Sequence, residues 1–223
     1  MTAPRSGLAV ALAFALLGCA TSDTRLPWAR RHAMPPPARE NRAGAPEESA
    51  GPAPGRAPEG DVNDVMRAVE AASSLVGRRA IVLDGVDYGP GCAAVVRAAF
   101  AHAGHPLPPE VRDAEAVHAF ASRRGALTAS RRPSRGDLVF LADRPGGLPA
   151  HVGLVARAEP DGTALVLYRV TRGVLRVRVN LAYPARPTDP ATGKRINDTL
   201  VVKSRAVPAG SLVVGVSDLL RRG

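Results

Sequence analysis

The sequence is poor in cysteine, in aromatic side chains and in lysine. Its 223 residues include two cysteines, one tryptophan and only 4% aromatic residues. Two cysteines exclude a disulfide-rich scaffold and a zinc site built from cysteines alone. With so few aromatic residues, the core must consist mainly of Val, Leu and Ala. The hydrophobic share of 45% is ordinary for a folded protein, so a wholly disordered chain is also excluded.

Positive side chains outnumber negative ones, and nearly all of the positive side chains are arginine. Thirty Lys and Arg stand against 20 Asp and Glu, which gives a formal net charge of +10, and Lys194 and Lys203 are the only lysines. The arginines are scattered singly and in pairs, without the basic stripe and interleaved aromatic residues that nucleic-acid binding favours. We therefore expect a solvated, arginine-rich surface. Attraction to an anionic polymer or a membrane surface is the second interpretation, and no nucleic acid is expected as a partner.

The N-terminus indicates export. Arg5 precedes an apolar run over residues 7–17, which is too short to span a bilayer and is typical of a signal peptide. The run ends in Gly18-Cys19, which resembles the bacterial lipoprotein signal, in which the cysteine becomes the new N-terminus and receives a lipid. The resemblance implies a signal peptide over residues 1–18 and a membrane anchor on Cys19. Ala20, in place of Asp, implies the periplasmic face of the outer membrane. An ordinary secretory signal is the alternative.

A proline-rich segment follows the predicted anchor. Residues 19–60 contain the run Pro35-Pro36-Pro37 and further prolines among Ala, Gly and Glu, without apolar periodicity. Proline fixes φ and removes backbone donors, so this composition predicts an extended tether. The remaining residues, 61–223, are enough for one globular domain.

Within that domain the apolar spacing changes from the helical period to the strand period. Asp61 is a candidate N-cap for the first helix, and Asp161-Gly162 is typical of a hairpin turn between two strands. The segment 213–220 either completes the sheet or forms a helical turn. Helices followed by consecutive strands predict an α+β fold with an antiparallel sheet. The predicted helices are 61–77, 92–103 and 110–125, and the predicted strands are 137–141, 151–155, 163–168, 174–179 and 199–202.

Cys92 and His151 are the candidate chemical groups. Cys92 follows Gly89-Pro90-Gly91 at the start of a predicted helix, where backbone N–H groups favour the thiolate. The glycines leave room for a substrate beside the thiol. His151 begins a predicted strand and is the candidate base, because a catalytic cysteine needs a histidine within hydrogen-bond reach. A buried structural cysteine is the alternative. No His, Cys or carboxylate pair has metal-binding spacing, so we expect no metal or other cofactor.

Three segments together resemble the NlpC-type cell-wall peptidases: the glycine-flanked Cys92, Arg135-Gly136-Asp137-Leu138-Val139-Phe140, and His151-Val152-Gly153-Leu154-Val155. The resemblance covers roughly residues 80–181. It implies a papain-like core, shared with the CHAP amidases, in which N-terminal helices pack on an antiparallel sheet. It also implies that Cys92 attacks a peptide or amide bond of a peptidoglycan stem peptide and that His151 is the base. The third polar residue of the family, which orients the histidine, falls on Tyr168. Gly91 and Arg172 would then adjoin the substrate; the other interpretation of Arg172, and the one its position favours, is a plain surface arginine.

The sequence departs from that family around the nucleophile. Gly91 stands where the family usually has Asp, and Ala93-Ala94 stand where it has Ser-Gly. Tyr168 carries no charge, so it would stabilise an imidazolium less than a carboxylate would. Two functions therefore remain open: an envelope lipoprotein that hydrolyses peptidoglycan, and a catalytically degenerate NlpC-like module that binds or scaffolds the envelope. In both, peptidoglycan is the expected partner, and the scissile bond and the oligomeric state stay open.

Overall fold

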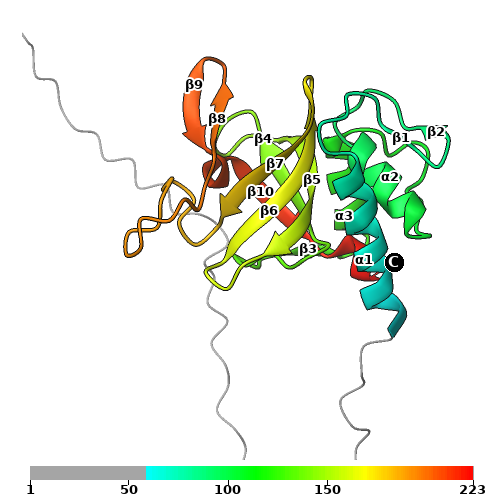
Figure 1. The fold of residues 1–223 in the computed structure, drawn as a ribbon, viewed down its shortest axis with the longest axis horizontal. Coiled ribbons are helices and arrows are strands. Elements are labelled where there is room, and N and C mark those ends of the chain that lie inside the picture. The colour runs from blue at the N-terminus through cyan, green and yellow to red at the C-terminus, as the bar shows by residue number, and fades with distance from the viewer. Residues whose placement is uncertain (1–58, 223) are drawn as a thin grey trace, which may run out of the picture. The chain divides into compact units, whose positions relative to one another are not determined.

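A six-stranded antiparallel sheet organises residues 59–222, the part of the chain that the computed structural model describes (Figure 1). Cys19, the predicted signal peptide and the predicted tether up to residue 58 lie outside the described residues. The sheet and the helices beside it confirm the predicted α+β class. In order across the sheet, the strands are β3 (Leu127–Thr128), β10 (Val213–Ser217), β4 (Leu138–Ala142), β5 (Pro149–Ala158), β6 (Thr163–Val170) and β7 (Gly173–Asn180).

Three α-helices of the described residues cover one face of this sheet, and all three carry apolar residues at helical spacing. They are α1 (Glu59–Ser74), α2 (Ala94–His102) and α3 (Ala114–Arg123). α1 begins two residues before the predicted start at Asp61. The Asp113 side chain caps α3 by accepting a hydrogen bond from Ala116 N at 2.8 Å. This cap places the start of α3 four residues later than predicted.

The start of α2 also differs from the prediction. The helix begins at Ala94, and the residue before it, Ala93, offers no side-chain hydrogen bond as a cap. Cys92 therefore lies in the turn that leads into the helix, ahead of its first residue. A short hairpin of β1 (Val82–Leu83) and β2 (Val86–Asp87) precedes this turn.

The main sheet has two apolar faces, and each belongs to a separate core. On the helix face, the alternate residues Leu138, Phe140, Val152, Leu154 and Leu167 pack in one buried cluster with the three helices. The residues between them point to the opposite face and form a second cluster. We call this the hairpin face. It is defined by Val139, Leu141, Val155, Val166, Tyr168, Val177 and Val179.

The hairpin face is covered by a two-stranded ribbon and a short helical turn. β8 (Thr199–Val202) was predicted as a strand, but it pairs with β9 (Arg205–Pro208) in a sheet of its own. In Figure 1 this ribbon stands on the side of the main sheet opposite the helices. The 3-10 turn η1 (Ala209–Leu212) packs Ala209 and Leu212 into the hairpin-face core. β10 then enters the main sheet between β3 and β4, and a second turn, η2 (Leu219–Arg222), follows it, so the C-terminal segment forms both a strand and a turn.

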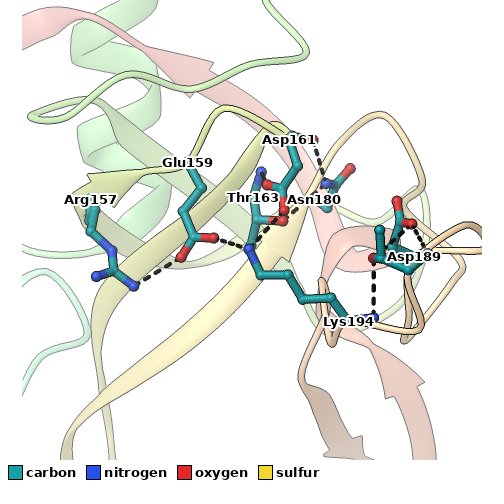
Figure 2. Close-up of polar contacts among 8 residues, drawn as sticks. Arg157, Glu159, Asp161, Thr163, Asn180, Asp189 and Lys194 are labelled. Atoms are coloured by element: carbon teal, nitrogen blue, oxygen red, sulfur yellow. Dashed lines mark hydrogen bonds and ion pairs between the residues drawn. The ribbon is translucent and has the colours of Figure 1, made fainter.

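The loop between β7 and β8 is fastened to the β5–β6 turn by Lys194 (Figure 2). Lys194 Nζ contacts the carboxylates of Glu159 and Asp161, the second at 2.9 Å, and Arg157 pairs with Glu159 at 2.9 Å. The hydrogen bond from Lys194 is the main reason that the pKa of Glu159 is lowered. Asp161-Gly162 forms the predicted turn, with Gly162 at φ +82°. This cluster holds the later part of the loop between β7 and β8, shortly before β8 begins.

No helix within residues 59–222 combines the length and the apolar character that a bilayer crossing needs.

Candidate functional site

Cys92 lies on the helix side of the sheet, against the start of α3. Its half-buried side chain packs on the helix-face core. Burial raises the pKa of the Cys92 thiol above its ordinary value of 9.0, and the Asp113 carboxylate adds to that effect. The Ala114 N–H opposes the shift but does not reverse it. The thiol is therefore protonated at neutral pH, unlike the thiolate that the helix-start position predicted.

Gly91 adjoins protein backbone where the sequence suggested room for a substrate. A Cβ added to Gly91 would lie 2.9 Å from the carbonyl oxygen of Arg112. On the other side of the turn, Arg169 of β6 donates hydrogen bonds to the carbonyl oxygens of Pro90 and Arg79, the second at 3.2 Å. The glycine thus permits close packing of the Cys92 turn between β6 and the segment before α3.

His151 lies on the hairpin face. It pairs with Leu141 of β4, and residues paired across an antiparallel ladder project to the same face. Its Nε2 atom is 3.3 Å from Asp143 Oδ1. Its ring is edge-on to that of Tyr168, with centroids 6.3 Å apart, and its Nδ1 atom is buried without a hydrogen-bond partner in the described residues. The structure thus brings His151 together with Asp143 and Tyr168.

The structure does not bring Cys92 and His151 together. Val152, the neighbour of His151, points to the helix face and packs in the same cluster as Cys92. Because successive strand residues point to opposite faces, the imidazole and the thiol are separated by the sheet itself. Among residues 59–222, no hydrogen bond joins Cys92 to His151. The imidazole of His151 contacts Asp143, and the thiol of Cys92 contacts the start of α3.

His151 and Tyr168 instead line a cavity of about 700 Å³ between the main sheet and the β8–β9 ribbon. We call it the hairpin cavity. Burial raises the pKa of Tyr168, and Asp198 adds to this, so the hydroxyl stays protonated and can donate a hydrogen bond. Arg172, in the turn between β6 and β7, is exposed at the rim. The walls are mainly apolar: Leu141, Ala142, Val170, Leu175, Leu200, Val201, Val202 and Leu212, with Thr199 as a further polar residue.

Two parts of this site were missed in the sequence. Asp143 follows the Leu138–Ala142 strand directly, and antiparallel pairing of that strand with the one beginning near His151 could have indicated their proximity. The second part is β8, which forms one wall of the hairpin cavity, and no feature of the sequence indicated that position. Its four residues predict a strand, but nothing local indicates that it leaves the main sheet and covers a cavity.

Comparisons with protein-family models, with curated protein sequences and with solved structures gave no match for this chain. The NlpC-like resemblance and the papain-like details of the fold accordingly stay predictions.

Proposed function

We propose that this chain is a binding module of the bacterial envelope, with an NlpC-like fold and without hydrolytic activity, and that it holds stem peptides of peptidoglycan in the hairpin cavity. The observation that carries the proposal is the separation of the predicted dyad. Cys92 faces α3 on one side of the sheet, while His151, Tyr168 and Arg172 line one cavity on the other.

The chemistry of the hairpin cavity suits a short anionic peptide. Its apolar walls can bury aliphatic side chains, and the protonated Tyr168 hydroxyl can donate to a carbonyl or carboxylate. The exposed Arg172 guanidinium matches a carboxylate in geometry and charge. The formal net charge of +10 favours approach to an anionic polymer. The cysteine is not required for any of these contacts.

The proposal is tested by sedimenting purified peptidoglycan with a Cys19→Ser chain, which cannot be lipidated. We expect Arg172→Glu to weaken binding by about tenfold or more, because it replaces a favourable charge by a repulsive one at the cavity rim. Arg123→Glu is the matched control: it makes the same charge change on an exposed residue of α3, away from the cavity, and should alter binding less than about twofold.

The same assay separates binding from hydrolysis. Cys92→Ala should leave sedimentation with the polymer unchanged, and the parent chain should release no peptide fragments on prolonged incubation. Fragment release that disappears in Cys92→Ala would instead establish the hydrolase. Equal binding by the Arg172→Glu and parent chains would remove the hairpin cavity as the binding site.

A further inference from the structure

β7 is an edge strand of the main sheet, and most of its outer edge is already occupied by other segments of the chain. In an antiparallel pair, alternate residues direct their backbone N–H and C=O groups away from the partner strand. At Val174, N donates to Arg78 O at 3.0 Å and O accepts from Gly77 N at 2.9 Å. At Arg178, N donates to Asp198 Oδ2 at 2.8 Å and O accepts from Asp198 N at 3.0 Å.

Arg176 is the position between these two occupied sites. It pairs with Leu167 of β6 in the same register as Val174 and Arg178, so its N–H and C=O also point outward. Within residues 59–222, no other segment hydrogen-bonds to either group. The occupied residues on its two sides are separated by about 13 Å of strand. The edge of β7 therefore has one open donor–acceptor pair, flanked by filled ones.

A second cavity, of about 400 Å³, lies at this opening. We call it the edge cavity. It is lined by residues of both faces of β7 and by the segment that leads into β8. It shares four residues with the hairpin cavity, so the two spaces adjoin. The shared residues are Tyr168, Leu175, Thr199 and Leu200, and the others are Arg176, Val177, Arg195 and Asp198.

The charges around the edge cavity favour a carboxylate. Its one acid, Asp198, is already paired with Arg178 at 3.2 Å and more loosely with Arg195 at 3.8 Å. Arg176 and Arg172 form no ion pair within the described residues, and both are exposed. Leu175 is 41% exposed between them, which offers an apolar contact at the junction of the two cavities. Open backbone groups, apolar surface and guanidiniums without an ion pair among the described residues thus meet along β7 and the turn before it.

We infer that an extended, carboxylate-bearing peptide adds to the edge of β7 at Arg176, through two main-chain hydrogen bonds made by a single peptide residue. The peptide C=O accepts from Arg176 N–H, and the peptide N–H donates to Arg176 C=O. One neighbouring side chain enters the hairpin cavity past Leu175, and a carboxylate pairs with Arg176 or Arg172. In strand addition of this kind, main-chain hydrogen bonds supply the affinity, and pockets for side chains supply the selectivity. The inference rests on the proposed function, since it supplies backbone recognition beside the same cavity.

Residue-resolved amide hydrogen exchange tests the inference on the Cys19→Ser chain. Without ligand, the Arg176 amide should exchange on the order of 100-fold faster than the amides of Val174 and Arg178, which are hydrogen-bonded. Two probes are used: disaccharide–peptide fragments from purified peptidoglycan, and the synthetic peptide acetyl-Ala-Glu-Ala-Glu-Ala-amide. A saturating acidic probe should slow the Arg176 amide by about tenfold or more, whereas the Lys analogue of the synthetic peptide should not.

Two variants separate the main chain from the charge. Arg176→Pro removes the outward N–H, which β6 does not use, and proline is tolerated on edge strands in this orientation. It should weaken probe binding by about thirtyfold, of which about tenfold is the lost hydrogen bond and about threefold the lost charge. Arg176→Gln keeps the N–H and should cost about threefold, an effect that disappears at high salt. If Arg176→Pro does not fold, the exchange measurement on the parent chain decides alone.

The outcomes distinguish this inference from the proposed function. Protection by the peptidoglycan fragments supports both. Protection by the synthetic peptide, in a chain that does not bind peptidoglycan, supports the β7 site and rejects the polymer as its ligand. Unchanged exchange of Arg176 at saturation with both probes overturns the inference, even if the chain sediments with peptidoglycan.

Discussion

Asn197→Ala is expected to lower the free energy of unfolding by about 3–5 kcal/mol, because this buried amide satisfies four backbone groups. Its Oδ1 accepts from Asn180 N at 2.8 Å and Gly210 N at 2.9 Å. Its Nδ2 donates to Tyr183 O at 2.9 Å and Arg186 O at 2.7 Å. Asn197 is only 1% exposed, so water cannot replace these partners without local opening. The side chain joins the end of β7, the loop after it and η1.

Urea unfolding measures this loss. Asn197→Asp should cost nearly as much, because a carboxylate keeps both acceptor contacts but faces two carbonyl oxygens without a donor. Asn63→Ala, on the exposed side of α1, is the matched control and should change stability by less than about 0.5 kcal/mol. A loss below about 1 kcal/mol for Asn197→Ala would mean that the loop between β7 and β8 is not held by this amide.

Arg221→Met is expected to destabilise the fold by about 3 kcal/mol at neutral pH, and by much less in acid. Asp137 is 2% exposed, and its carboxylate accepts from Ser134 N at 2.7 Å and pairs with Arg221. Burial raises the pKa of Asp137 above 3.8, while the Ser134 N–H and Arg221 act in the opposite direction. Removing Arg221 takes away the positive charge and the hydrogen bond that offset the burial of the Asp137 carboxylate, so the pKa of Asp137 rises further.

The sign of the pH dependence follows from this shift. A raised pKa in the folded state means that the contribution of Asp137 to stability is fully present below 3.8 and is lost as the pH rises through the folded value. The Arg221→Met deficit should therefore shrink as the pH is lowered from 7.5 toward 4. Arg222→Met removes the more exposed pair with Asp218 and should cost less than about 1 kcal/mol. A deficit for Arg221→Met that stays constant between pH 7.5 and 4 would show that Asp137 is not the group responsible.

Much of the fold could be predicted from the sequence, because its signals are local. The alternation of Val and Leu with Arg over 174–179 and the apolar run over 163–168 predict β7 and β6, and Asp161-Gly162 predicts the turn that joins β5 to β6. The position of β10 between β3 and β4 could not be predicted in this way. That pairing joins segments far apart in the chain, and the apolar pattern of residues 213–217 is equally compatible with a strand at an edge.

The candidate site was harder to predict, because it depends on which face a side chain takes. Apolar residues occupy both sets of alternate positions in the segment 151–155: Val152 and Leu154 in one set, Val155 in the other. The pattern therefore cannot decide whether His151 points toward the helices or away from them. The register with β4 decides it, by placing Phe140 and Val152 on the helix face. A similar ambiguity affected Cys92: without a capping side chain at Ala93, the sequence does not mark where α2 begins.

Cys92 and His151 lie on opposite faces of the main sheet, and the pH profile of Cys92 alkylation shows whether they act as a catalytic pair. In the Cys19→Ser chain Cys92 is the only thiol, so the pH dependence of its reaction rate with iodoacetamide reports its thiolate fraction. Because burial raises the pKa of this thiol, we predict a half-maximal rate above pH 9 and the same profile in His151→Ala. Rapid alkylation near neutral pH that is lost in His151→Ala would show that the two side chains act together and would support the hydrolase.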